Sequence, residues 1–270
     1  MIVKWGFICR SVQNYMEHLS MHWHQEDVHL WKNEPGYVSI EYTFASPHFN
    51  SAANVNELLD RAVALKAVFD GAMMLASLPD GRFIPFDLEA IVDLTTQKRH
   101  DHHGEGNVLV EPFDNRVHPL FHSEKIIHER YGPEDMIRQA RFDPIAKGLL
   151  RHLGHNGPDF RSLYSLLDWM ETEGWTEEKV AAVSGQKTTA VKSFTATANN
   201  ETVLGPMARH GNKGWTAPSK PMPLIDAQRL ILPAARSFLK TRALEFQSTG
   251  IWPKYVKPPK YSKSKHRPKV

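Results

Sequence analysis

The sequence predicts an α+β fold, in which an N-terminal mixed α/β unit is followed by a C-terminal helical bundle and a disordered basic tail. In the first half, segments rich in β-branched and aromatic residues flank one long amphipathic helix. The second half shows helical periodicity interrupted by glycines, and residues 250–270 combine lysine and proline with few apolar side chains. We expect the units at residues 1–130, 131–248 and 249–270.

The clearest element of the N-terminal unit is a helix that begins after Asn54 and runs to about Ala76. Asn54 and Glu57 form a capping pattern, and apolar residues recur behind them at helical spacing. Alternating β-branched and aromatic residues predict a strand over 37–45. After a turn at 79–81, residues 82–94 predict one or two strands and residues 107–113 predict another.

Four helices are expected in the C-terminal unit. The boundary before them is expected near Tyr131-Gly132-Pro133. Asp159 is a candidate cap, Gly174 a candidate helix end, and Pro233 should kink or restart the last helix. The expected helical ranges are 133–153, 159–173, 176–200 and 224–246, which together predict a small bundle.

Composition limits the class of protein. The 270 residues are 41% hydrophobic and 23% charged, which is in the globular range, and no apolar run approaches the length of a membrane helix. The apolar stretch near the N-terminus is too short for a secretory signal, and the single cysteine, Cys9, cannot form an internal disulfide. We expect a soluble cytoplasmic protein without a membrane partner and without a cofactor.

The tail is strongly basic. Residues 250–270 carry seven Lys and Arg and no acidic residue, so the net charge of +3 leaves about −4 for the rest of the chain. Lysines could neutralise phosphates while Trp252, Tyr255 and Tyr261 stack on unpaired bases. The alternative is a solubilising tail that binds nothing specific. The candidate contact residues are Lys254, Lys257, Lys260, Lys263, Lys265 and Arg267.

Motifs for metal binding and common catalysis are weak. Among the 15 histidines, His118 and His122 are the first pair to test for a metal, but none of the pairs has zinc-site spacing, and scattered imidazoles explain them better. Residues 98–107 read as a solvated hairpin turn. No phosphate-binding loop, nucleophile elbow or metalloprotease helix occurs. Cys9 lies in an apolar context typical of an inert thiol.

Residues 178–194 resemble the helix-turn-helix of bacterial regulators. Ala181, Gly185 and Val191 have the spacing of the small residue, the turn glycine and the recognition-helix anchor, with Val180 and Phe194 as further core positions. The alternative is one bent helix with Gly185 inside it. In the helix-turn-helix interpretation, the residues facing a DNA groove and its phosphates are Gln186, Lys187, Thr188, Thr189 and Lys192.

A second resemblance begins where the first ends. The helix ending in FTATANN, the loop with MARHG and the following amphipathic helix resemble the closing half of the HEPN superfamily of helical bundles, over about residues 135–246. That resemblance implies a metal-independent ribonuclease, a homodimer, and catalytic roles for Arg209 and His210. Active members separate the Arg from the His, whereas here they are adjacent. The alternative is a structural role, with the pair held by acids such as Glu201 or Asp226.

The sequence therefore predicts a nucleic-acid-associated protein, with RNA favoured over DNA. RNA binding or a degenerate HEPN-like ribonuclease activity, in stress or phage defence, is the leading hypothesis, and Asn200 would join its contact surface. The alternatives are a helix-turn-helix DNA-binding regulator and a non-enzymatic interaction scaffold. A helix break near Gly185 with residues 186–192 exposed would favour DNA binding, whereas clustering of Asn200, Arg209 and His210 around a cleft would favour the HEPN-like hypothesis.

Overall fold

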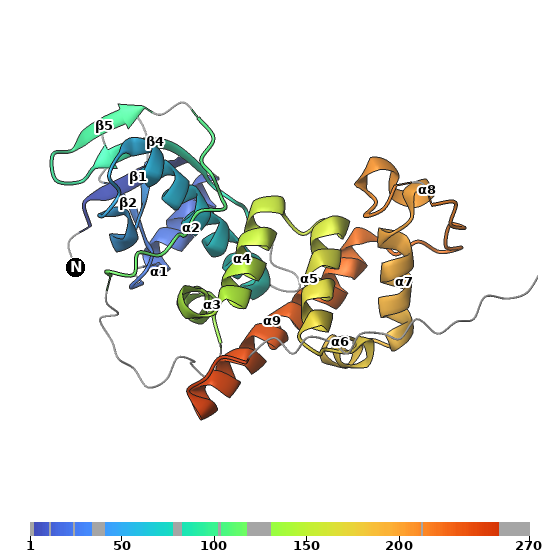
Figure 1. Cartoon of the computed structure of the whole chain (residues 1–270). Coiled ribbons are helices and arrows are strands. Elements are labelled where there is room, and N and C mark those ends of the chain that lie inside the picture. The colour runs from blue at the N-terminus through green and yellow to red at the C-terminus, as the bar shows by residue number, and fades with distance from the viewer. Residues whose placement is uncertain are drawn as a thin grey trace, which may run out of the picture. The chain divides into compact units, whose positions relative to one another are not determined.

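The computed structural model describes residues 3–10, 12–23, 25–33, 41–77, 83–101, 104–117, 131–211 and 213–253. The chain forms two compact units, Met1–Gly157 and Pro158–Val270. The first contains a sheet and the second is helical, which confirms the predicted α+β class (Figure 1). The division falls after residue 157 and not near 131, because two helices assigned by sequence to the bundle pack with the sheet unit.

The first unit is built on a five-stranded antiparallel sheet in the order β2-β3-β1-β4-β5. The hairpin turn between β4 and β5 lies at residues 94–97, so residues 98–101, expected in a turn, form a strand. The expected strand over 37–45 begins at residue 42, and residues 34–40 lie outside the described ranges. The strands are β1 (Trp5–Arg10), β2 (His29–Lys32), β3 (Tyr42–Ala45), β4 (Asp87–Asp93) and β5 (Lys98–Asp101).

Aromatic rings join the sheet to helix α2 (Val55–Ala76). Phe69 of α2 lies 4.8 Å from the ring centroid of Trp23 and 6.0 Å from that of Phe44 on β3, and all three side chains are buried. On the other face of the sheet, Ile8, Ala90 and Val92 form a smaller buried cluster. Short helices α1 (Gln13–His22) and η1 (Pro47–Phe49) complete this half of the unit.

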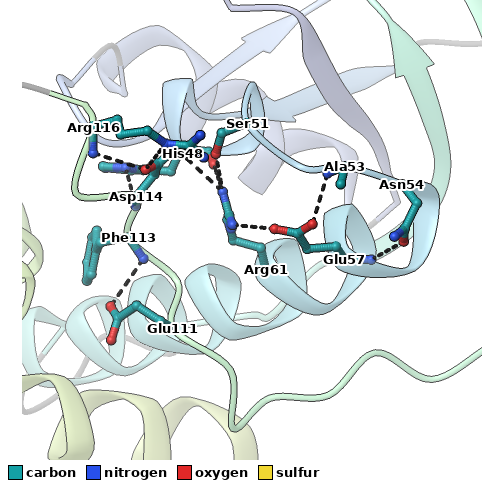
Figure 2. Close-up of polar contacts among 10 residues, drawn as sticks. All are labelled: His48, Ser51, Ala53, Asn54, Glu57, Arg61, Glu111, Phe113, Asp114 and Arg116. Atoms are coloured by element: carbon teal, nitrogen blue, oxygen red, sulfur yellow. Dashed lines mark hydrogen bonds and ion pairs between the residues drawn. The ribbon is translucent and has the colours of Figure 1, made fainter.

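The start of α2 follows the predicted capping pattern. The Asn54 side chain accepts a hydrogen bond from the backbone nitrogen of Glu57, and the Glu57 carboxylate accepts one from Ala53 (Figure 2). These bonds satisfy amide groups that have no partner within the first helical turn. The predicted helix over Asn54 to Ala76 is confirmed.

Residues 107–113 do not form the predicted strand. Asn107 accepts a hydrogen bond from the amide of Leu109, while its own amide donates to Asp60. Arg151 donates to the carbonyl oxygens of Leu109 and Val110. These backbone groups are bonded to side chains and are therefore not available for hydrogen bonds to a neighbouring strand. Leu109 is exposed, although the segment is apolar.

A buried polar network fixes the segment that follows (Figure 2). His48 is fully buried; its Nε2 lies 2.9 Å from Asp27, and its Nδ1 accepts the amide of Asp114 at 3.0 Å. Arg61 donates to the His48 carbonyl oxygen and to Ser51. Although partial burial opposes the effect, hydrogen bonds from Arg116 and Ser51 hold the pKa of Asp114 well below its usual range. Both ring nitrogens of His48 are hydrogen-bonded, so the imidazole links Asp27 to the backbone of Asp114 and has a structural role.

Helices α3 (Pro133–Phe142) and α4 (Pro144–Asn156) replace the single helix expected over 133–153. Pro144 cannot donate a helical hydrogen bond, and it keeps Asp143 in an extended conformation. The Asp143 side chain then caps α4 by accepting from Ile145. The chain therefore turns at residue 143, and both helices pack against α2.

Helices α2 and α4 cross in backbone contact. A Cβ at Gly71 would lie 2.0 Å from the carbonyl oxygen of Leu150, and one at Gly154 would lie 1.9 Å from that of Ala67. Only glycine at both positions permits this approach.

Within its described residues, the second unit contains five α-helices and a short 3-10 helix. Helices α5, α6 and α7 pack against α9, and the predicted bundle is observed (Figure 1). Asp159 caps α5 as predicted, and Pro233 lies inside a continuous α9 without ending it. The elements are α5 (Phe160–Thr172), α6 (Glu177–Val183), α7 (Thr188–Ala198), α8 (Glu201–Leu204), η2 (Gly205–Met207) and α9 (Leu224–Thr249).

We expect Gly71→Ala to lower the free energy of unfolding by about 3 kcal/mol, because the added methyl group overlaps the α4 backbone. Helix propensity alone would favour alanine by about 1 kcal/mol, so the sign of the change reports the clash. Urea unfolding followed by circular dichroism measures it. Gly104→Ala is the control, since a Cβ there has no heavy atom within 4 Å. Equal stability of the two variants would contradict the close crossing.

Candidate nucleic-acid interface

Helices α6 and α7 are separated by a tight turn at Gly185. Gly185 has a φ of +64°, and its amide donates to the carbonyl oxygen of Ala182 at 3.1 Å. The amide of Gln186 donates to Ala181 at 2.8 Å. This pair of bonds is the Schellman motif that ends many helices, and it places a left-handed residue where glycine is favoured. The single helix expected over 176–200 is therefore two helices.

The buried positions are those that the helix-turn-helix spacing predicted. Val180 and Ala181 on α6 and Val191 and Phe194 on α7 are each at most 2% exposed. Ala181 lies on the buried side of α6, and α6 packs against both α7 and α9. The hydroxyl of Ser184 donates to the carbonyl oxygen of Leu230 on α9, which ties the turn to the bundle. The arrangement matches the resemblance in its turn and in its core.

The opposite side of the turn and of α7 is exposed. Gln186, Lys187, Thr189 and Lys192 are all exposed, and Thr188 is half-buried. Thr189 and Lys192 are three residues apart and so share one face of α7. No side chain caps the start of α7, so its first amide groups add positive potential next to Lys187. The residues proposed to face DNA therefore lie together on one surface.

Arg209 and His210 are held by different partners from those the sequence suggested. The Arg209 guanidinium pairs with Asp168 on α5 at 2.8 Å and lies 4.0 Å from the centroid of the Tyr164 ring. The edge of the His210 imidazole meets the Trp215 ring with centroids 5.6 Å apart. Neither Glu201 nor Asp226, the acids proposed from sequence, forms the ion pair with Arg209.

Asp168 is the acidic member of this cluster. Partial burial raises the pKa of Asp168, and the positive charges of Arg209 and His210 oppose that shift. Burial also raises the pKa of neighbouring Glu171, and the like charge of Asp168 adds to it. The cluster thus combines a guanidinium, an imidazole and a carboxylate whose charged form is disfavoured by its surroundings.

Asn200 has a structural role. It is 3% exposed, its side-chain oxygen accepts the amide of Val203, and its side-chain nitrogen donates to the carbonyl oxygens of Trp215 and Thr216. It therefore caps α8 and holds the loop that carries Trp215. Burial and these three bonds do not fit the predicted contact with nucleic acid.

Several sequence candidates lie outside the described residues. These are His118, His122 and the tail positions Lys254, Lys257, Lys260, Lys263, Lys265 and Arg267. Among the residues that are described, no group of three or more His, Cys, Asp or Glu could hold a metal ion. Cys9 is buried, and burial raises the pKa of its thiol far above the usual range, which agrees with an inert thiol.

The residues that sequence reasoning missed are Asp168 and Tyr164. Both lie on α5, more than forty positions before Arg209, and no spacing rule links residues that meet only when α5 packs beside the loop. Their positions one helical turn apart on α5 are the only sign of a shared face.

Comparisons of the chain with known families, proteins and structures found no match. No protein-family model, curated protein or solved structure shows a significant match to the chain. Within the described ranges, no helix combines the length and the apolar character that crossing a membrane requires.

We expect Ala181→Leu to lower the free energy of unfolding by about 2 kcal/mol, since the larger side chain must fit on the buried side of α6, which packs against α7 and α9. Ala182→Leu is the matched control, because the neighbouring position is exposed. Thermal and urea unfolding of both variants measure the difference. If Ala181→Leu were as stable as Ala182→Leu, the tight packing around Ala181 would be refuted.

Proposed function

We propose that the C-terminal unit binds duplex DNA through α6, the Gly185 turn and α7, and that the protein is a DNA-binding regulator. The observation that carries the proposal is the break at Gly185 with an exposed, partly basic surface beyond it. In one unbroken helix, residues 186–192 would have no second helix packed against them for support. In helix-turn-helix proteins the first helix supports the second, whose N-terminal residues enter the major groove.

The exposed side chains suit two kinds of DNA contact. Gln186 and Thr189 carry amide and hydroxyl groups that can hydrogen-bond to base edges. Lys187 and Lys192 supply positive charge for phosphates. Val191 and Phe194, on the buried side of α7, hold the helix to the bundle and so fix which side chains face outwards. The tail would add further phosphate contacts through its lysines.

The proposal predicts that Lys187→Ala combined with Lys192→Ala weakens binding to duplex DNA at least about tenfold. The slope of log K against log salt should also become shallower by about two, since two phosphate contacts are lost. Fluorescence anisotropy with labelled duplex DNA across a salt series measures both quantities.

Two further proteins serve as controls. The double variant Lys98→Ala and Lys220→Ala removes the same charge from exposed positions elsewhere and should bind almost as the natural chain does. A chain ending at Gly250 separates the contribution of the tail. Equal losses in the two double variants would reduce the interaction to nonspecific charge attraction, and no DNA binding by the natural chain would reject the proposal.

A second candidate function is cleavage of RNA at the Arg209 and His210 cluster. The supporting observation is that Asp168 lies close to both, so a base, a guanidinium and an acid occupy one place, with the Trp215 ring beside them. His210 would move the proton of a 2′-hydroxyl, and Arg209 would stabilise charge on the phosphate. A phosphate would have to replace Asp168 as the partner of Arg209.

If that candidate is correct, His210→Ala abolishes cleavage of labelled single-stranded RNA while duplex DNA binding persists. The ring of His210 contacts Trp215 in a loop and lies outside the helices, so circular dichroism should show an unchanged helical content. His155→Ala, at an exposed histidine in the other unit, is the control. Cleavage that survives in His210→Ala would end this candidate. If neither nucleic acid binds the natural chain, an interaction scaffold is the remaining function.

A further inference from the structure

An aromatic ring is exposed beside Arg209 and His210. Trp215 lies in the loop between η2 and α9 (residues 208–223) and is 50% exposed. The imidazole of His210 meets the indole at an interplanar angle of 89° and so covers only part of it. Trp215 therefore offers a flat apolar surface on which another ring can stack.

The loop that carries Trp215 is held in place at two points. The buried side chain of Asn200 donates to the carbonyl oxygens of Trp215 and Thr216, each at 3.2 Å. The amide of Arg209 donates to the carbonyl oxygen of Ala198 at the end of α7, at 2.9 Å. Because these bonds already fix the backbone on both sides of the loop's first turn, a ligand that binds the ring has less conformational entropy to overcome.

The positive charge of this loop lies close to the exposed ring. Residues 202–223 contain three Lys and Arg residues and no acidic residue. Lys213 precedes Trp215 by two positions, and Arg209 adjoins His210, whose ring contacts the indole. Both Arg209 and Lys213 are exposed. An anionic ligand on the ring would therefore meet cations from the same loop.

Arg209 is oriented by neighbours that bind it weakly. Its guanidinium lies 4.0 Å from the centroid of the Tyr164 ring on α5. Its ion-pair partner Asp168 is 41% exposed, and exposed pairs of this kind contribute little stability. Partial burial also raises the pKa of Asp168, so the surroundings disfavour the charged carboxylate. A phosphate, which stays charged and has several acceptor oxygens, can replace this partner.

The combination of a flat ring with nearby cations selects among anionic ligands. An acidic peptide supplies charge but has no ring at each charged position. In a duplex, the faces of the bases are already stacked on one another. A single strand presents an unpaired base beside a phosphate at every nucleotide, which is the combination that aromatic and basic side chains bind together.

We propose that this surface binds single-stranded nucleic acid, with one unpaired base stacked on Trp215 and neighbouring phosphates held by Arg209 and Lys213. The inference rests on the second candidate function, whose substrate class it names, although binding itself requires no cleavage. It does not depend on duplex binding by α7. The contact of His210 with Trp215 would place the imidazole beside the bound nucleotide.

Fluorescence anisotropy with the full chain and a labelled RNA of eight uridines tests the proposal. Trp215→Ala should weaken binding about tenfold, as expected for the loss of one base stack, and Trp215→Phe should restore most of the affinity. Leu244→Ala is the control, because it removes a side chain of similar exposure, 49%, from α9. If the natural chain does not bind this RNA, or if Trp215→Ala binds it equally well, the proposal is overturned.

Inorganic polyphosphate separates stacking from charge, because it carries phosphates without bases. Trp215→Ala should leave its affinity unchanged, whereas Lys213→Ala should weaken both ligands and make the salt slope for RNA shallower by about 0.7. Asp168→Asn should strengthen RNA binding about threefold, since Arg209 loses its competing partner. An equal loss of both ligands in Trp215→Ala would overturn the stacking, and displacement of the RNA by polyglutamate as readily as by unlabelled RNA would assign the surface to acidic peptides instead.

Two comparisons identify the strand and separate this proposal from cleavage. A DNA strand of eight deoxyuridines presents the same base without the 2′-hydroxyl, so the strand that binds more tightly in a Trp215-dependent manner identifies the source. Binding that depends on Trp215 without any cleavage would support the proposal and reject only the ribonuclease candidate. Cleavage by Trp215→Ala with an unchanged kcat and KM would reject the stacking and leave the ribonuclease candidate intact.

Discussion

The backbone contact between α2 and α4 is the constraint on which the first unit depends. Helix α2 is buried on two sides, with the aromatic rings of the sheet against one and α3 and α4 against the other. Gly71 and Gly154 allow the second contact because neither has a side chain to hold the helices apart. The ion pair of buried Asp70 with half-buried Lys66 lies on α2 beside a pocket next to this crossing.

A single left-handed residue has a comparable effect in the second unit. Gly185 adopts a left-handed conformation after α6, and two hydrogen bonds at the turn direct the chain so that α7 packs beside α6. The consequence is a division of side chains: Ala181 and Phe194 point into the bundle, whereas Lys187 and Lys192 remain exposed. The turn at Gly185 thus separates the buried side chains from the lysines of the exposed surface.

Polar groups in this protein find partners far along the chain. Arg209 pairs with Asp168, and Arg242 forms a buried ion pair with Glu173. His48 joins Asp27 to the backbone of Asp114. Sequence reasoning searched for partners near each residue and so proposed Glu201 or Asp226 for Arg209. The same limitation made Asn200 look like a surface contact, although the loop at Trp215 folds over it and takes both hydrogens of its amide.

The sequence by itself determined the elements whose signals are local. Asn54 with Glu57, Asp159 and the helix-turn-helix spacing around Gly185 each act within a few residues, and the structure agrees with them. The tertiary structure alone decided the rest. Residues 107–113 have strand-like composition, but side chains from Asp60 and Arg151 bind their backbone. Helices α3 and α4 have bundle-like periodicity, yet both pack against α2. For α4 this depends on two glycines that lie far apart in the sequence, because the helices come this close only where both lack a side chain.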